Sequence, residues 1–266
     1  MGRRRLDAEL VRRGLVASRP EAQAAVREGL VTVAGRPADK PSTLVAPAEP
    51  LELRARPRPF VSRGGEKLDA ALDRFGIEVG GRGCLDAGAS TGGFTDCLLH
   101  RGAARVVAVD VGYGQLAWSL RKDDRVNVLE RTNVRELNPE RLPFIPSVLV
   151  ADLSFISLRT IVPVLADLAA ARADLLLLVK PQFEAGPADV EPGGVVRDPE
   201  VWRRAIEGVA QGCAAHGLGP VGVMASPLVG PAGNLEFFLH AVKGARPRPL
   251  DVEAALGAGR RVGGAA

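Results

Sequence analysis

The 266-residue sequence predicts two domains of different fold class: a small α+β domain, followed by a larger α/β domain with a doubly wound parallel sheet. Beyond residue 62, short apolar strands alternate with helical segments, the pattern of a sheet with helices on both faces. Residues 84–99, CLDAGASTGGFTDCLL, read as a strand, a glycine turn and the start of a helix. The basic excess is confined to the first 60 residues, which hold 12 Lys+Arg against 7 Asp+Glu, whereas the remainder holds 23 against 24.

The N-terminal domain is expected to contain two helices and a small hairpin. Apolar residues on one face predict a first helix over 5–14, and Ser18 with Glu21 forms a capping box that starts a second helix ending at Gly29. Short strands are expected over 30–33 and 51–53. A basic module beside a near-neutral enzyme favours nucleic-acid binding, although solvated surface arginines would give the same charge. The candidate RNA contacts are Arg4, Arg5, Arg12, Arg13, Arg19 and Arg27, with Arg63 from the second domain.

The second domain begins with a helix over 62–72 and ends with an antiparallel strand pair. Its parallel strands are expected near 83–86, 105–110, 126–130, 147–152 and 174–180. A helix over 197–216 precedes strands near 221–225 and 235–242, which the turn at 230–234 connects. We therefore divide the chain into a domain over 1–56, a linker over 57–61, a domain over 62–243 and a mobile tail over 244–266, which is rich in Gly, Ala, Arg and Pro.

The glycine turn predicts a cofactor site at the carboxyl edge of this sheet. Ser90 stands where the dinucleotide signature G-x-G-x-x-G has its second glycine, which a pyrophosphate needs and S-adenosylmethionine (SAM) does not. A turn that serves only packing is the alternative. Asp110 follows the second strand, where a carboxylate can bind both ribose hydroxyls, and Asn133 is a candidate adenine contact. Tyr113 and Trp118 are candidates to pack on the adenine ring. The remaining cofactor candidates are Asp86, Gly88, Gly92, Gly93, Phe94, Val111 and Asp152.

Three charged residues occupy positions that core packing explains poorly. Asp152 ends the fourth strand, and Lys180 ends the fifth directly after a run of leucines and a valine. Burying an ammonium costs several kcal/mol, so a catalytic role is favoured over a lysine that snorkels to the surface. Glu236 lies in an otherwise apolar strand, whereas Lys67 alone carries little information.

Several stretches resemble the hemolysin A or TlyA family of ribosomal RNA 2′-O-methyltransferases, whose catalytic domain is FtsJ-like. They include VSRGGEKL, LDAGASTGGFTDCLL, VADLSFISL, LVKPQFE and PLVGPAGNLEFFL. The resemblance implies a Rossmann-like class I SAM-dependent methyltransferase fold and methylation of cytidine 2′-hydroxyls in small- and large-subunit rRNA. It also implies a catalytic Lys-Asp-Lys-Glu tetrad at Lys67, Asp152, Lys180 and Glu236.

The N-terminal sequence resembles RNA-binding domains of the ribosomal-protein-S-four type. Departures from the family pattern occur at Glu66, in the linker RPFV (58–61) and in the loop 186–189, and they leave the substrate range open.

Composition narrows the function classes further. The sequence shows neither an apolar run near the ~20 residues of a membrane helix nor the apolar core of a secretion signal at its start. Its three cysteines have no metal-ligand spacing and are expected to be buried thiols. We therefore expect a cytoplasmic monomer that needs no metal and acts on ribosomal RNA or ribosomal subunits. A non-catalytic ribosome-assembly factor and a pore-forming haemolysin are the alternatives.

Overall fold

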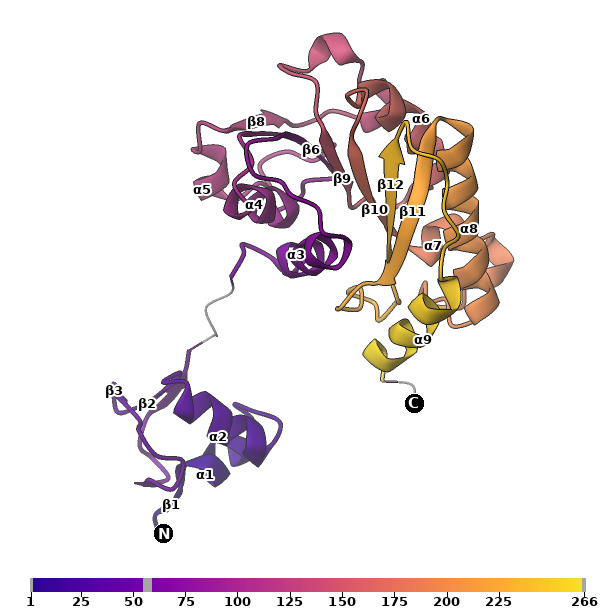
Figure 1. The fold of residues 1–266 in the computed structure, drawn as a ribbon. Coiled ribbons are helices and arrows are strands. Elements are labelled where there is room, and N and C mark those ends of the chain that lie inside the picture. Colours follow the sequence, from indigo (N-terminus) through magenta and orange to yellow (C-terminus); the bar gives the residue numbers. More distant parts are fainter. Residues whose placement is uncertain (1, 55–58, 265–266) are drawn as a thin grey trace. The chain divides into compact units, whose positions relative to one another are not determined.

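The computed structural model describes residues 2–54 and 59–264, which belong to two compact units divided after Arg58 (Figure 1). Residues 57 and 58 of the predicted linker, together with 1, 55, 56, 265 and 266, lie outside the described residues. The first three residues after the gap, 59–61, belong to the second unit. Because Val61 donates its backbone N–H to the Asp96 carboxylate at 2.8 Å, this part of the predicted linker is attached to that unit.

The N-terminal unit contains the two predicted helices and the predicted strand pair. Its helices are α1 (Leu6–Arg12) and α2 (Arg19–Arg27). Its strands are β1 (Arg4–Arg5), β2 (Val31–Val33), β3 (Arg36–Pro37), β4 (Leu44–Val45) and β5 (Leu51–Leu53). β2 pairs antiparallel with both β3 and β5, and β1 pairs with β4. Ser18 caps α2, and Leu6, Leu10 and Val26 are buried in a small core.

The larger unit is built on a mixed seven-stranded sheet. Its strands are β6 (Gly83–Ala87), β7 (Arg105–Val109), β8 (Val126–Leu129), β9 (Val148–Ala151), β10 (Asp174–Val179), β11 (Leu218–Ala225) and β12 (Phe237–Lys243). Their spatial order is β11-β12-β10-β9-β6-β7-β8. β6 to β10 are parallel, and β12 runs antiparallel to its neighbours β10 and β11. This arrangement confirms the predicted doubly wound sheet and its terminal antiparallel pair.

Helices cover both faces of the sheet, with a hydrophobic core on each side (Figure 1). One face carries α3 (Arg63–Phe75), α4 (Gly93–His100) and α5 (Trp118–Arg121). The other carries α6 (Leu158–Leu168), α8 (Pro199–Ala215) and α9 (Val252–Val262). The short helix α7 (Pro181–Glu184) follows β10. Three 3-10 turns lie in the loops: η1 (Val134–Glu136), η2 (Pro139–Arg141) and η3 (Pro187–Asp189). Because parallel strands end at one edge, the loops there bring distant residues together.

The predicted mobile tail differs from the structure, which places helix α9 there. Asp251 caps this helix by accepting a hydrogen bond from the Ala254 N–H at 3.0 Å. Val252, Ala255 and Leu256 are buried against the sheet and α8. The spacing of these three residues places them on one helix face, which composition alone did not reveal. All three cysteines are free and buried, as expected.

Candidate active site

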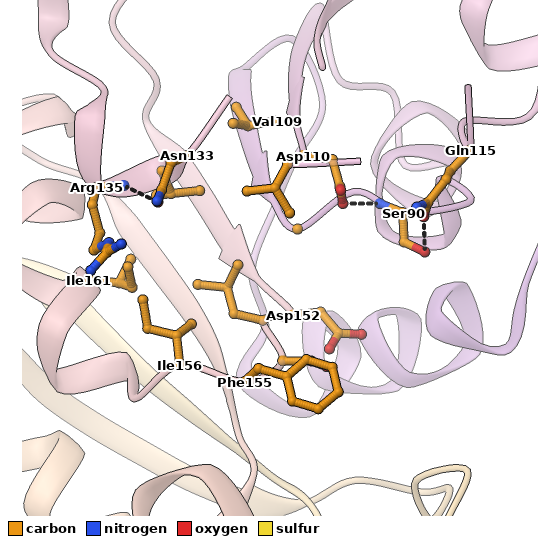
Figure 2. A pocket seen from close by; sticks show the side chains of 15 residues that line it. Ser90, Val109, Asp110, Gln115, Asn133, Arg135, Asp152, Phe155, Ile156 and Ile161 are labelled. Atoms are coloured by element: carbon orange, nitrogen blue, oxygen red, sulfur yellow. Dashed lines mark hydrogen bonds between the residues drawn. The ribbon is translucent and has the colours of Figure 1, made fainter. Parts of the chain in front are cut away.

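A cavity of about 520 Å³ lies at the carboxyl edge of the parallel strands (Figure 2). Its lining comes from the loops after β6, β7, β8 and β9 and from the start of α6. The predicted cofactor residues that line it are Gly88, Ser90, Asp110, Val111, Asn133 and Asp152. Six of the ten residues predicted to bind the cofactor therefore line one cavity. The cavity lies at the carboxyl edge of the sheet, where the glycine turn predicted a cofactor site.

The glycine turn adopts the left-handed conformations that its sequence allows. Gly88 has φ +90°, and a Cβ there would collide with the backbone carbonyl of Asp152, so only glycine fits between the two strand ends. Ser90 also has a positive φ, of 49°, which is unusual for a residue with a side chain. Its N–H donates to the Asp110 carboxylate at 2.8 Å, and this charge-assisted bond offsets part of the backbone strain (Figure 2).

Asp110 directly follows β7 and faces the turn after β6. One carboxylate oxygen accepts the Ser90 N–H, and the other accepts the Gly112 N–H at 2.7 Å. The two bonds fix the carboxylate at the cavity wall. The cavity also contains Asn133, whose side chain accepts the Arg135 N–H at 3.1 Å and so orients the loop after β8.

Asp86 is fully buried beneath the glycine turn. Thr95 of α4 donates its hydroxyl to one carboxylate oxygen at 2.7 Å, and the other oxygen has no hydrogen-bond partner among the described residues. Burial raises the pKa of Asp86 to about 7, with the nearby Asp152 carboxylate adding to the effect. A buried carboxylate with an unsatisfied oxygen is costly, and its position next to a ligand-binding turn suggests a functional reason.

The four predicted catalytic residues form two ion pairs at this same edge. The Lys180 ammonium lies 2.6 Å from an Asp152 carboxylate oxygen and donates to the Ser154 hydroxyl at 3.0 Å. Lys180 follows β10 and Asp152 follows β9, so the pair spans two neighbouring parallel strands.

The second pair is more deeply buried. Lys67 of α3 donates to the Glu236 carboxylate at 2.6 Å, with side-chain exposures of 7% and 1%. Glu236 directly precedes β12, and the β10–β12 register places it opposite Lys180. Gly230 packs against it, because a Cβ there would lie 2.6 Å from a Glu236 carboxylate oxygen. Both lysines therefore reach the same sheet edge from different elements.

Five further residues that the sequence predicted as cofactor contacts do not line the cavity. Gly92 and Gly93 are close-packing positions, since a Cβ would collide with Leu120 or with the Ser62 hydroxyl, respectively. Phe94 is 3% exposed and stacks on Phe238 in the core. Neither Tyr113 nor Trp118 lines the cavity; both are about two-thirds exposed, at 69% and 67%.

The cavity also contains residues that the sequence did not identify, including Gln115, Arg135, Leu153, Ser154 and Phe155. Phe155 is 92% exposed, has φ +64° and contacts the Phe183 ring at a centroid distance of 5.2 Å. An exposed aromatic residue with a strained backbone is a functional signal, but its position four residues beyond the end of β9 did not stand out in the sequence.

The predicted RNA-binding arginines fall into two groups. Asp7 pairs with Arg5 and Arg19, and Glu9 pairs with Arg12 and Arg13. Arg13 also donates to the backbone carbonyls of residues 46, 47 and 49, so its main task is structural. The side chains of Arg4, Arg27 and Arg63 are exposed and make no hydrogen bond or ion pair with any residue that the structure describes.

Within residues 2–54 and 59–264, no helix is long and apolar enough to cross a membrane.

Comparison with known proteins identifies both units. Residues 60–243 match the FtsJ-like methyltransferase family, and residues 4–49 match the S4 domain. The chain is 56% identical, over 89% of each sequence, to the 16S/23S rRNA (cytidine-2′-O)-methyltransferase TlyA of Mycobacterium tuberculosis. It is 38% identical to Hemolysin A of Brachyspira hyodysenteriae, over 90% of this chain and 99% of that one.

A solved structure from Streptococcus thermophilus that carries the name hemolysin superposes with a TM-score of 0.74. It has 36% identity and covers 100% of this chain and 97% of that one. The match to the FtsJ-like model covers more than half of the chain, and the curated relatives cover nearly all of it. The chain therefore belongs to the FtsJ-like methyltransferases and, within them, to the TlyA family.

Proposed function

We propose that this methyltransferase transfers a methyl group from SAM to the 2′-hydroxyl of cytidine in small- and large-subunit ribosomal RNA. The observation that carries the proposal is the pair of Lys–carboxylate contacts at the sheet edge, of which Lys180–Asp152 adjoins the cavity. This edge is where open α/β sheets bind their ligands. The names of the TlyA relatives supply the nucleoside and the atom.

The residues of the cavity fit SAM. The Asp110 carboxylate suits the two ribose hydroxyls, and the apolar wall near Val111 and Ile156 suits the adenine ring. Asp86 has a buried unsatisfied oxygen beside the turn, and such a group accommodates a cationic ligand. When bound, the cofactor would supply a methyl group on a sulfonium, which is transferred directly to the attacking oxygen.

The charged residues would act on the ribose rather than on the cofactor. We assign Lys180, as the neutral amine that remains after its ammonium has released a proton to solvent, as the base that removes the 2′-hydroxyl proton. Lys67 is the positive charge that stabilises the developing alkoxide. Asp152 and Glu236 orient the two lysines through the 2.6 Å contacts and balance their charge in a buried site. Ser154 holds the Lys180 side chain from a second direction.

The N-terminal unit would anchor the RNA. Arg4 and Arg27 are exposed and unpaired among the described residues, and Arg5, Arg12 and Arg19 remain partly exposed beside their carboxylates. Such side chains contact phosphates, which supply most of the affinity for nucleic acids. Phe155 presents an open aromatic face at the cavity, a surface on which an unstacked base can lie.

Alkaline hydrolysis of the methylated RNA tests this function. A 2′-O-methyl group removes the internal nucleophile, so the bond on the 3′ side of the modified nucleotide should resist cleavage. Ordinary alkali sensitivity at the labelled nucleotide, with the methyl on a base, would contradict the assignment of the ribose oxygen. RNA incubated with the Lys180→Ala protein serves as the control and should stay sensitive throughout.

A further inference from the structure

A second cavity, of about 370 Å³, lies on the α3 face of the sheet, away from the catalytic edge. Its walls come from the end of α3, the outer strand β11, β12 and the segment that leads into α9. The ionisable residues in its lining are Arg74, His240, Arg248 and Asp251. The proposed methylation does not use this cavity.

The lining of this cavity contains two exposed guanidinium groups and one carboxylate. Arg74 and Arg248 make no side-chain hydrogen bond or ion pair with any described residue. The single carboxylate in the lining, Asp251, already accepts the Ala254 N–H at 3.0 Å as the cap of α9. The cavity therefore has a net positive charge that the described residues do not neutralise, which favours an anion.

The cavity is held rigidly by its neighbours. The β11–β12 register shifts between Pro220 and Gly222, and the Pro220 carbonyl accepts the Arg248 N–H at 2.8 Å. A bulge of this kind redirects a strand and often accompanies a binding site. His240 is fixed by Asp174, whose carboxylate lies 2.9 Å from its Nε2, and its ring packs against Phe75 at a centroid distance of 5.2 Å.

The same two elements connect this cavity to the catalytic pair. Lys67 and Phe75 are both on α3, and Glu236 and His240 lie at the start of and within β12. Eight residues of helix and four residues of strand each span about 12–13 Å. The two contacts between α3 and β12 therefore lie about that far apart, so a ligand in the second cavity would be close to an RNA whose ribose reaches Lys67.

We propose that this second cavity binds a backbone phosphate of the RNA substrate through Arg74 and Arg248, at a distance from the methylated ribose. The proposal rests on the proposed function for the identity of the ligand, because a phosphodiester is the anion that an RNA substrate supplies at many positions. Two unpaired guanidinium groups in one cavity match a phosphate, which accepts hydrogen bonds on several oxygens. The contact would extend RNA binding onto the methyltransferase unit.

Inorganic phosphate tests the cavity without any RNA. The chain has three histidines, so the imidazole resonances of His240 can be followed by NMR in the full-length protein after assignment with His100→Gln and His216→Gln. Phosphate should shift the His240 resonances in the wild type and leave them unmoved in the Arg74→Ala/Arg248→Ala protein. Unmoved His240 resonances in the wild type at high phosphate, or equal shifts in both proteins, would overturn the proposal.

RNA binding provides the second arm, with a matched control. Arg172→Ala/Arg260→Ala removes the same charge from exposed arginines outside both cavities. The Arg74→Ala/Arg248→Ala protein should bind a substrate rRNA fragment about tenfold more weakly, and the slope of log K against log salt should be smaller by about 1, because one phosphate contact is lost. The control protein should keep most of the wild-type RNA affinity and most of the wild-type salt slope. SAM affinity should be unchanged in both double variants.

Equal RNA affinity and equal salt slopes in the two double variants would refute the phosphate contact. Absence of methyl transfer to rRNA by the wild type would instead refute the proposed function, and the phosphate titration would still decide what the second cavity binds.

Discussion

Single side chains at the sheet edge have separable tasks. Asp110 lies at the cavity wall and would hold the cofactor ribose, whereas Lys180 would act on the RNA hydroxyl. Asp110→Ala should weaken SAM binding by about 1–3 kcal/mol, because it removes a charged hydrogen-bond acceptor. Lys180→Ala should leave SAM affinity nearly intact and lower the methyl-transfer rate by about 10²–10⁴. Calorimetry with SAM and single-turnover transfer rates measure the two effects.

The exposed Lys122 provides the control, since its ammonium lies over the Trp118 ring and makes no hydrogen bond or ion pair with any residue that the structure describes. Lys122→Ala should change neither quantity. Unchanged SAM affinity in Asp110→Ala would remove that residue from the cofactor site. A rate loss below tenfold in Lys180→Ala would move the base, with Lys67 the next candidate.

The sequence identified charged residues at strand ends but not how they pair. Lys180 and Asp152 were predictable because buried apolar runs precede both of them. The sequence named two lysines and two carboxylates without pairing them, and in the structure each lysine contacts one carboxylate. Those contacts depend on the register of β12 against β10 and on the placement of α3, which no local pattern encodes. Phe155 was missed for the same reason, since its exposure follows from the loop conformation.

At the scale of elements, periodicity predicted the long strands and helices, and composition failed at the C-terminus. The segment after residue 244 is rich in Gly, Ala, Arg and Pro, and this composition predicts a mobile tail. Its few apolar residues nevertheless recur at helical spacing and cover the sheet face beside α8. The two-residue strands β1, β3 and β4 were also missed, because so short a segment carries no periodic signal.

Helix α9 should therefore contribute to stability. Leu256 is 2% exposed and packs in the core, so Leu256→Ala should lower the free energy of unfolding by about 2–4 kcal/mol. Val262 is on the same helix but is 39% exposed, and Val262→Ala should cost less than about 1 kcal/mol. Urea unfolding measures both. Equal and small effects would support a mobile tail instead of a docked helix.

At the scale of the whole molecule, the two units should respond to pH in opposite directions. In the N-terminal unit, hydrogen bonds from Arg12 and Arg13 lower the pKa of Glu9 to about 2, and Arg5 lowers that of Asp7. A carboxyl with a depressed pKa stabilises the fold above its unfolded pKa, and this stability is lost as the pH falls through the folded value. The N-terminal unit should therefore lose stability from about pH 4.5 downward.

In the methyltransferase unit, Asp86 has the opposite effect. Burial raises its pKa to about 7, so the folded state binds a proton that the unfolded state has released between about pH 4 and pH 7. Its contribution is complete below about pH 4 and is lost as the pH rises to about 7, by ~4 kcal/mol at most.

Calorimetry without cofactor should show the wild type losing stability relative to Asp86→Asn as the pH rises from 5 to 7. In the same scans Glu9→Gln should weaken the acid sensitivity of the N-terminal unit alone. A constant difference between the wild type and Asp86→Asn across this range would mean that Asp86 is ionised in the folded protein throughout, and its unsatisfied oxygen would then need a cation even before SAM binds.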